Sequence, residues 1–192
     1  QHLVWVLSSW QIVVERYPKL GEVVVVGTAP YDFKGFIGFR NFLMTDETGN
    51  YLAYANTLWC LLDTESSKPA KPLEEMLKGY VLEPKLNMEY APRRIIIPEN
   101  GREGEEVLIR PHHLDTNHHV NNGQFVRIAL DSLRRNYRVG QLRAEYKKQV
   151  MLGDVLVPYI AYTEDERCVV ALKDKEGMVC CIVELKEERQ ND

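Results

Sequence analysis

Apolar and polar residues alternate along most of this chain, in runs that are rich in β-branched and aromatic side chains and are interrupted by Asp/Gly turns. Alternation with a period of two, broken by such turns, predicts antiparallel strands joined by hairpins. The strands predicted in the first part of the chain cover roughly 4–17, 22–31, 35–45 and 51–63. Those predicted in the last part cover roughly 106–110, 143–151, 155–163, 167–174 and 178–187.

A helical pattern is found from about residue 121 to residue 136. The apolar face of this predicted helix, spaced as i, i+3, i+4, i+7 and i+8, consists of Phe125, Ile128, Ala129, Ser132 and Leu133. Asn121 or Asn122 can cap its N-terminus, because a side-chain oxygen there accepts an unpaired N–H of the first turn. A shorter helix is predicted over 73–80.

The chain also contains an internal repeat. The sequence Leu-Gly-Glu-Val-Val-Val at 20–25 resembles Leu-Gly-Asp-Val-Leu-Val at 152–157, and Asp-Glu-Thr-Gly at 46–49 resembles Asp-Lys-Glu-Gly at 174–177. Two matches in the same order favour a duplication. In the first copy, the helix equivalent to 121–136 would fall mostly before Gln1. We therefore expect a strand and a helix, together on the order of 30 residues, to precede this chain in the complete protein.

These patterns predict two structural units and a connection. The first unit covers residues 1–65 and lacks its N-terminal strand and helix, and the second covers residues 105–192. Between them, residues 66–104 form a linker or crossover, because the segment is rich in Pro, Ser, Lys and Gly and does not alternate.

Composition excludes several classes of protein. The chain has 192 residues, 45% of them hydrophobic and 27% charged, which is typical of a globular protein with a substantial core. A net charge of −4 gives no support to nucleic-acid binding, and no apolar run approaches the roughly 18 residues of a membrane span. No signal peptide is recognisable. The four cysteines lack metal-ligand spacing and indicate reduced thiols in a cytoplasmic protein.

The densest group of chemically active side chains directly precedes the predicted helix. The run Asp-Thr-Asn-His-His at 115–119 combines a carboxylate (Asp115), an amide (Asn117) and two imidazoles (His118 and His119). These side chains can hold, polarise and deprotonate a water molecule, and a helix N-terminus favours an oxygen that gains negative charge. The motif therefore indicates hydrolysis or hydration of a carbonyl compound.

Several segments resemble the acyl-acyl-carrier-protein (acyl-ACP) thioesterases of bacteria and plants. The segments that carry the resemblance are 5–12, 16–22, 55–59 with 61–63, and 114–122, in the order that the family has them. The resemblance implies an α+β fold with a tandem (double) hotdog, in which each unit is an antiparallel sheet wrapped round a long helix. It also implies hydrolysis of fatty acyl-ACP in fatty acid biosynthesis.

Carried over by position, the resemblance implies catalytic roles for Asp115, Asn117 and His119, and substrate binding by Val120, Asn121 and Asn122. The family has a further catalytic Glu in a Tyr-Arg-Arg-Glu-Cys run on the next strand. Alignment on Glu145-Tyr146-Lys147-Lys148 places Gln149 at that Glu and Val150 at the Cys. An amide cannot act as a general base, so Gln149 would only orient water, and Asp115 or His119 would have to activate it.

The mechanism that the resemblance implies needs no metal and no diffusible cofactor. Its partner is an acyl carrier protein with a phosphopantetheine-linked acyl chain; monomer and homodimer are both compatible with the sequence, because two hotdog units in one chain can pair internally. Two alternatives stay open. One is a hotdog acyl-CoA thioesterase or hydratase, and the other is a non-catalytic acyl-binding hotdog, which Gln149 motivates.

Each of these residues also has a plainer interpretation. Asp115, Asn117 and Asn121 are common turn and cap residues. The pairs His112-His113 and His118-His119 lack an acidic or cysteine partner at metal-ligand spacing, so surface or strand positions are preferred for the first pair. Three tryptophans can line an acyl tunnel, although buried aromatic side chains more often belong to the plain core: Trp5, Trp10 and Trp59. Six basic residues can attract an acidic carrier protein, although for each one alone a solvated helix surface is the preferred interpretation: Arg127, Arg134, Arg135, Arg138, Lys147 and Lys148.

Overall fold

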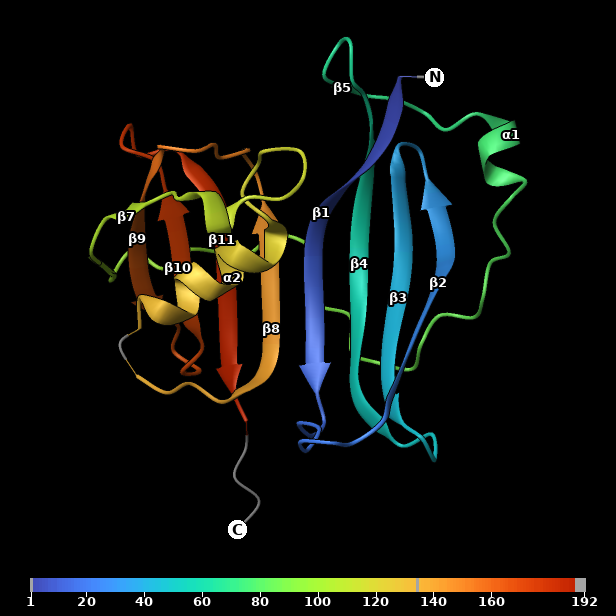
Figure 1. Ribbon diagram of the computed structural model, residues 1–192, viewed down its shortest axis with the longest axis horizontal. Coiled ribbons are helices and arrows are strands. Elements are labelled where there is room, and N and C mark those ends of the chain that lie inside the picture. The colour runs from blue at the N-terminus through green and yellow to red at the C-terminus, as the bar shows by residue number, and fades with distance from the viewer. Residues whose placement is uncertain (1, 134, 189–192) are drawn as a thin grey trace. The chain divides into compact units, whose positions relative to one another are not determined.

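The computed structural model describes residues 2–133 and 135–188, which form two compact units that divide between Ala91 and Pro92. Within each unit the long strands pair antiparallel (Figure 1). The division lies inside the segment 66–104, where a linker is predicted. Among the described residues, no helix has both the length and the apolar character that crossing a membrane requires.

The sheet of the first unit has the strand order β2-β3-β4-β1. Its strands are β1 (Leu3–Val14), β2 (Val24–Lys34), β3 (Ile37–Asp46) and β4 (Tyr51–Asp63), with the two-residue β5 (Lys68–Pro69) paired to β4. The four long strands confirm the predicted ones. Within residues 2–91 the only helix is the four-residue α1 (Glu74–Leu77), inside the predicted 73–80.

Buried polar side chains hold an irregular segment against the first sheet. Gln11 donates from Nε2 to the carbonyl of Glu89 (2.8 Å), and its Oε1 accepts the N–H of Ala91 (2.9 Å). Asn41 Oδ1 accepts the N–H of Leu86 (3.2 Å). Residues 86–91 form no strand, but these bonds satisfy part of their backbone and keep them on the sheet.

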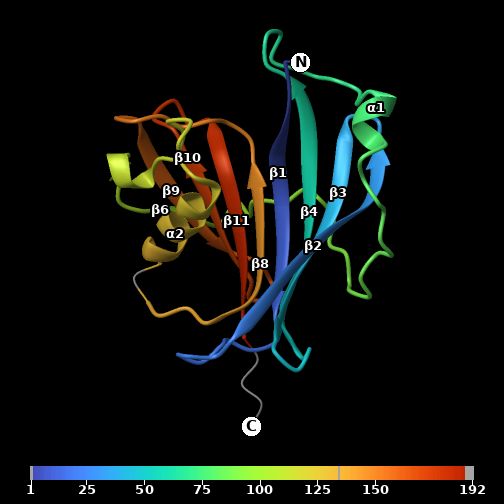
Figure 2. The ribbon, with the colours of Figure 1, turned by 45° about the vertical axis from the view of Figure 1, so that its right-hand side comes forward.

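The sheet of the second unit has the order β8-β11-β10-β9-β6. Its strands are β8 (Val139–Tyr146), β9 (Val155–Tyr162), β10 (Cys168–Lys173) and β11 (Val179–Glu187), and two short strands, β6 (Arg102–Glu103) and β7 (Val107–Leu108), pair with β9. The helix α2 (Asn122–Asp131) lies across one face of this sheet in both views (Figures 1 and 2). It buries Phe125, Ile128 and Ala129, as its spacing predicts.

The opposite face of the second sheet carries the segment that follows Pro92. Ile95 packs with Val169 and Ile182 in a buried cluster. Beside it, Arg143 donates from Nη1 to Glu184 Oε1 (2.9 Å), and both side chains are more than 90% buried. Nη2 of Arg143 donates to the carbonyl of Arg94 (3.2 Å). The arginine of this buried ion pair therefore also holds the segment that follows Pro92.

Several predicted boundaries are wrong, among them those of one strand and one helix in the second unit. The strand predicted at 143–151 is β8, which starts at Val139 and ends at Tyr146, because the N–H groups of Lys147 and Lys148 both donate to the carbonyl of Cys180 (2.9 and 3.1 Å). Because Lys147 and Lys148 both lie opposite Cys180, they form a β-bulge, and the regular pairing of β8 with β11 stops there. The helix predicted to reach residue 136 ends at Asp131, where the hydroxyl of Ser132 donates back to the carbonyl of Ile128 (2.7 Å).

The internal repeat recurs in backbone geometry. In the first unit the N–H groups of Glu15 and Arg16 share the carbonyl of Leu52, which is the same bulge as that of Lys147 and Lys148 opposite Cys180. The two Leu-Gly turns match as well, since Gly21 and Gly153 have φ values of +84° and +85°. Only glycine adopts this conformation readily, which explains the glycine in both copies.

Candidate active site

The motif at 115–119 forms a tight hairpin turn. The N–H of Asp115 donates to the carbonyl of His119 (2.8 Å), and the N–H of His118 donates to the carbonyl of Asp115 (3.1 Å). Asp115 Oδ1 accepts the N–H groups of Asn117 (2.8 Å) and His119 (3.2 Å). This is a three-residue hairpin loop with one left-handed residue, and one carboxylate oxygen holds it together.

The same turn occurs at the two Asp-x-x-Gly hairpins. In the first hairpin the N–H of Asp46 donates to the carbonyl of Asn50, and the carbonyl of Asp46 accepts the N–H of Gly49. In the second, Asp174 makes the same two bonds with Met178 and Gly177. The left-handed position is glycine in both of these hairpins. In the motif it is His118, with a φ of +62°. The interpretation of Asp115 as a turn residue is therefore correct for one of its oxygens.

We predict that His118→Gly stabilises the second unit. The left-handed conformation costs a non-glycine residue about 1–2 kcal/mol, and the greater entropy of glycine in the unfolded chain offsets about 0.5–1 kcal/mol of that. His118 is exposed, so little packing is lost. Urea unfolding should show a gain of about 0.5–1 kcal/mol in the free energy of unfolding. A loss of stability in this variant would contradict the assignment, and Thr116→Gly, at a position with negative φ, is the matched control that should destabilise.

Asn121 caps α2 and uses most of the donors at its N-terminus. Its Oδ1 accepts the N–H of Gly123 (2.8 Å), and its carbonyl accepts that of Gln124 (2.9 Å) and that of Phe125 (3.3 Å). Within the described part of the chain, the N–H of Asn122 is the donor of this first turn that has no partner. The helix end therefore offers one free backbone N–H, fewer than its sequence predicts.

The motif is tied to the chain that follows β8. The N–H of Val120 donates to the carbonyl of Val150 (2.9 Å), and His119 and Met151 form an isolated antiparallel bridge. Gln149 lies in this connection, three residues beyond the end of β8 and not on the strand where it is predicted. Gln149 therefore directly precedes Val150, the residue whose carbonyl accepts a hydrogen bond from the motif's neighbour Val120.

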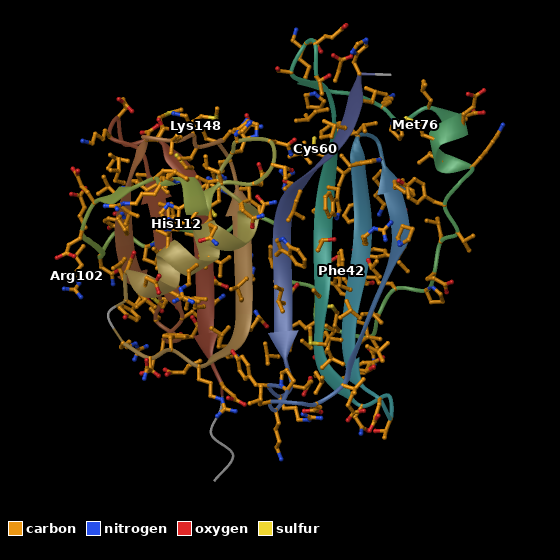
Figure 3. The ribbon with its side chains drawn as sticks, viewed as in Figure 1. Phe42, Cys60, Met76, Arg102, His112 and Lys148 are labelled. Atoms are coloured by element: carbon orange, nitrogen blue, oxygen red, sulfur yellow. The ribbon has the colours of Figure 1, made fainter. Side chains whose placement is uncertain are left out.

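Gln149 is exposed and lines a pocket of about 280 Å³ at this end of the second unit. Its other lining residues include Lys148 (labelled in Figure 3), Asp154, Asp174 and the buried Cys180. Lys148 Nζ lies 2.6 Å from Asp174 Oδ2, and this hydrogen bond raises the pKa of Lys148 and lowers the pKa of Asp174. Asp115, Asn117 and His119 are not among the described residues that line this pocket.

The side chains of the motif differ in how accessible they are. Asp115 and His119 are half-buried, Asn117 is exposed and Val120 is buried. Within residues 2–133 and 135–188, Asp115 Oδ2 and the side-chain amide of Asn117 form no hydrogen bond, so both are free to bind water or substrate. The hydroxyl of Tyr146 donates to the carbonyl of Asn122 (3.0 Å). In the sequence, Tyr146 serves only to align the neighbouring residues and is assigned no role.

His112 and His113 lie in a short 3₁₀ turn (Pro111–His113), not on a strand. His113 Nδ1 accepts the N–H of Arg110 (3.0 Å), and burial lowers the pKa of this imidazole. Among the described residues, no three His, Cys, Asp or Glu side chains are arranged to hold a metal ion.

The tryptophans lie among aromatic and apolar side chains, and most of the six basic residues lie beside carboxylates. Trp5 and Trp59 line a pocket of about 200 Å³ in the first unit, and Trp10 packs on Phe42 with ring centroids 5.3 Å apart. Five of the six basic residues pair with carboxylates: Arg127 with Asp131, Arg135 with Glu187, Arg138 with Glu188, Lys147 with Glu145 and Lys148 with Asp174. Arg134 lies outside the described residues.

Comparison with known proteins identifies the fold and then the family. A crystal structure of an acyl-ACP thioesterase from Bacteroides thetaiotaomicron superposes with a TM-score of 0.87 over 97% of this chain and 77% of that one, at 23% identity. A Mycobacterium tuberculosis protein described as having a double hotdog fold matches with a TM-score of 0.55 over 94% of this chain and 74% of that one, at 13% identity. The tandem hotdog prediction is thereby confirmed.

In sequence, residues 1–80 match the acyl-ACP thioesterase N-terminal domain, and residues 99–186 match the C-terminal domain. A chloroplastic acyl-acyl-carrier-protein hydrolase of Cuphea viscosissima is 25% identical over 85% of this chain. The chain belongs to the acyl-ACP thioesterase family. It spans 42% of the length of the Cuphea protein, less than half of that relative.

Proposed function

We propose that this protein hydrolyses the thioester of fatty acyl-ACP and releases a free fatty acid, which ends chain elongation. The observation that carries the proposal is the placement of the motif. A turn with a free carboxylate oxygen (Asp115 Oδ2) leads directly into a helix whose first N–H (Asn122) has no partner among the described residues. Thioester hydrolysis requires a base and a donor for the carbonyl oxygen, and this short segment supplies one of each.

In the proposed mechanism the thioester carbonyl lies against Asn122, with its oxygen bound by that N–H and by the side-chain amide of Asn117. Asp115 Oδ2, helped by His119, takes a proton from a water molecule, and the water oxygen forms a bond to the carbonyl carbon. The carbon–sulfur bond then breaks, and the proton passes to the sulfur of the phosphopantetheine arm. Val120 and Asn121 hold the turn and the helix end on which the substrate rests.

Gln149 favours a second candidate, a hotdog protein that binds acyl chains without turnover. An amide at the position of the family's Glu removes one possible base. In the leading proposal Gln149 orients the attacking water, and Asp115 alone supplies the basic oxygen.

We infer that the donor is an acyl carrier protein and that the protein acts in the cytoplasm. Five of the six basic residues named from the sequence are paired with carboxylates, so these five attract an acidic carrier less than unpaired cations would. The homodimer considered from the sequence stays a prediction, and sedimentation of the intact protein tests it.

The test is release of free thiol from a panel of acyl-ACP and acyl-CoA substrates by the intact protein, beside Gln149→Glu. Turnover of acyl-ACP in excess of acyl-CoA supports the proposal. Binding of acyl-ACP without turnover in the wild type, with activity gained in Gln149→Glu, would establish the second candidate. Turnover of acyl-CoA in excess of acyl-ACP would replace the proposed donor.

A further inference from the structure

Two segments that are far apart in sequence meet at the candidate site: the turn and helix start at 115–123, and the connection at 147–151. The links through Val120 and through His119 join their backbones. A third link is made by a side chain that the proposed mechanism does not use, the phenol of Tyr146.

Tyr146 occupies the last regular position of β8. It is paired in register with Cys181 of β11, and the bulge at Lys147 and Lys148 begins with the next residue. Its main chain is therefore fixed by the sheet, while the chain beyond it turns away toward Gln149. A side chain at this position is a rigid reference point for both segments.

From that position the phenol reaches the start of α2. The Tyr146 hydroxyl donates to the carbonyl of Asn122 (3.0 Å), and its ring packs on Phe125 with centroids 5.9 Å apart. Burial raises the pKa of Tyr146 well above its usual range, so the hydroxyl stays protonated and acts as a donor. Asn122 is the residue at the helix end whose own N–H has no partner among residues 2–133 and 135–188.

We infer that Tyr146 is a positioning residue for thioester hydrolysis: it holds the carbonyl of Asn122 and so fixes the orientation of this residue, whose N–H, in the preceding peptide group, binds the carbonyl oxygen in the transition state. This inference rests on the proposed function. A donor that stabilises a developing oxyanion must be held in place before the reaction, and a small displacement weakens it. Removal of the hydroxyl should therefore affect the chemical step more than substrate binding.

The second unit supplies a matched control. Tyr137 also donates its hydroxyl to a backbone carbonyl, that of Leu185 (3.1 Å), and burial raises its pKa to about 12. Tyr137→Phe and Tyr146→Phe therefore delete the same kind of bond, but only the second bond is made to α2. A loss caused by lower stability alone would appear in both variants.

The experiment is steady-state hydrolysis of acyl-ACP by the intact wild type and both variants, with thermal unfolding of each. We expect Tyr146→Phe to lower kcat about threefold to tenfold with KM within about twofold, and Tyr137→Phe to leave both near the wild type. Equal kcat in the two variants, or a change confined to KM, would overturn the inference.

Amide hydrogen exchange at Gly123 and Gln124 provides a readout that does not depend on activity. Tyr146→Phe should speed exchange at these two amides relative to the wild type, and Tyr137→Phe should not. Unchanged exchange in Tyr146→Phe would contradict the anchoring role even if kcat falls. If the wild type has no turnover, the proposed function fails, while the exchange experiment still decides whether Tyr146 anchors the helix start.

Discussion

Asp115→Asn should lower kcat for acyl-ACP hydrolysis by about 10²–10⁴-fold, the range that a general base contributes. The substitution is selective because the two carboxylate oxygens have different roles. Oδ1 accepts the N–H groups of Asn117 and His119, and the amide oxygen of asparagine can accept both. Oδ2, which has no hydrogen-bond partner among the described residues, becomes an NH₂ group that cannot take a proton from water.

The control is Asp46→Asn in the first unit. Asp46 Oδ1 holds its own turn through the N–H groups of Thr48 (3.0 Å) and Asn50 (2.9 Å), as Asp115 holds the motif. That variant makes the same chemical change outside the candidate site and should keep kcat within about twofold of the wild type. Wild-type kcat in Asp115→Asn would assign the base to another group, with His119 as the next to test.

Glu184→Leu should lower the free energy of unfolding by about 3–5 kcal/mol, the usual cost of removing one partner of a buried ion pair. Glu184 accepts from Arg143 through Oε1 (2.9 Å) and from Arg167 through Oε2 (3.1 Å). Without the carboxylate, the Arg143 guanidinium remains buried with backbone carbonyls as its remaining acceptors. The loss also weakens the attachment of residues 92–94, because Arg143 holds the carbonyls of Pro92 and Arg94.

Urea unfolding of the intact protein measures this loss. Asp131→Ala is the control, because Asp131 pairs with Arg127 (3.1 Å) while both side chains are more than 60% exposed. An exposed pair at this i, i+4 spacing contributes about 0.3–0.5 kcal/mol. A loss of less than about 1 kcal/mol in Glu184→Leu would show that the buried pair contributes little.

The sequence predicts the sheets well, because alternation and Asp/Gly turns are local signals. It predicts the end of β8 badly, because the bulge at Lys147 and Lys148 depends on a carbonyl of β11, and no local pattern records that contact. The motif shows both outcomes. Asp115 and Asn117 are recognisable as turn residues, but His118 occupies a position where the two related turns have glycine, which hides the shared geometry.

The sequence indicates which residue types make up the candidate site, but it does not show which backbone N–H groups remain available there. The cap at Asn121 uses three N–H groups of α2, and only the folded structure shows that the N–H of Asn122 has no partner in the described part of the chain. The role of Tyr146 also depends on a contact across 24 residues, for which strand alternation gives no signal.

The most direct test of the proposed function follows the products of a single reaction in water enriched with heavy oxygen. The intact protein is mixed with acyl-ACP, and free fatty acid and carrier-protein thiol are quantified by mass spectrometry. Hydrolysis predicts equal amounts of both products, with one solvent oxygen in each fatty acid released and none in the unreacted thioester. Recovery of intact acyl-ACP from a bound complex, with neither product formed, would contradict the assignment of this protein as a thioesterase.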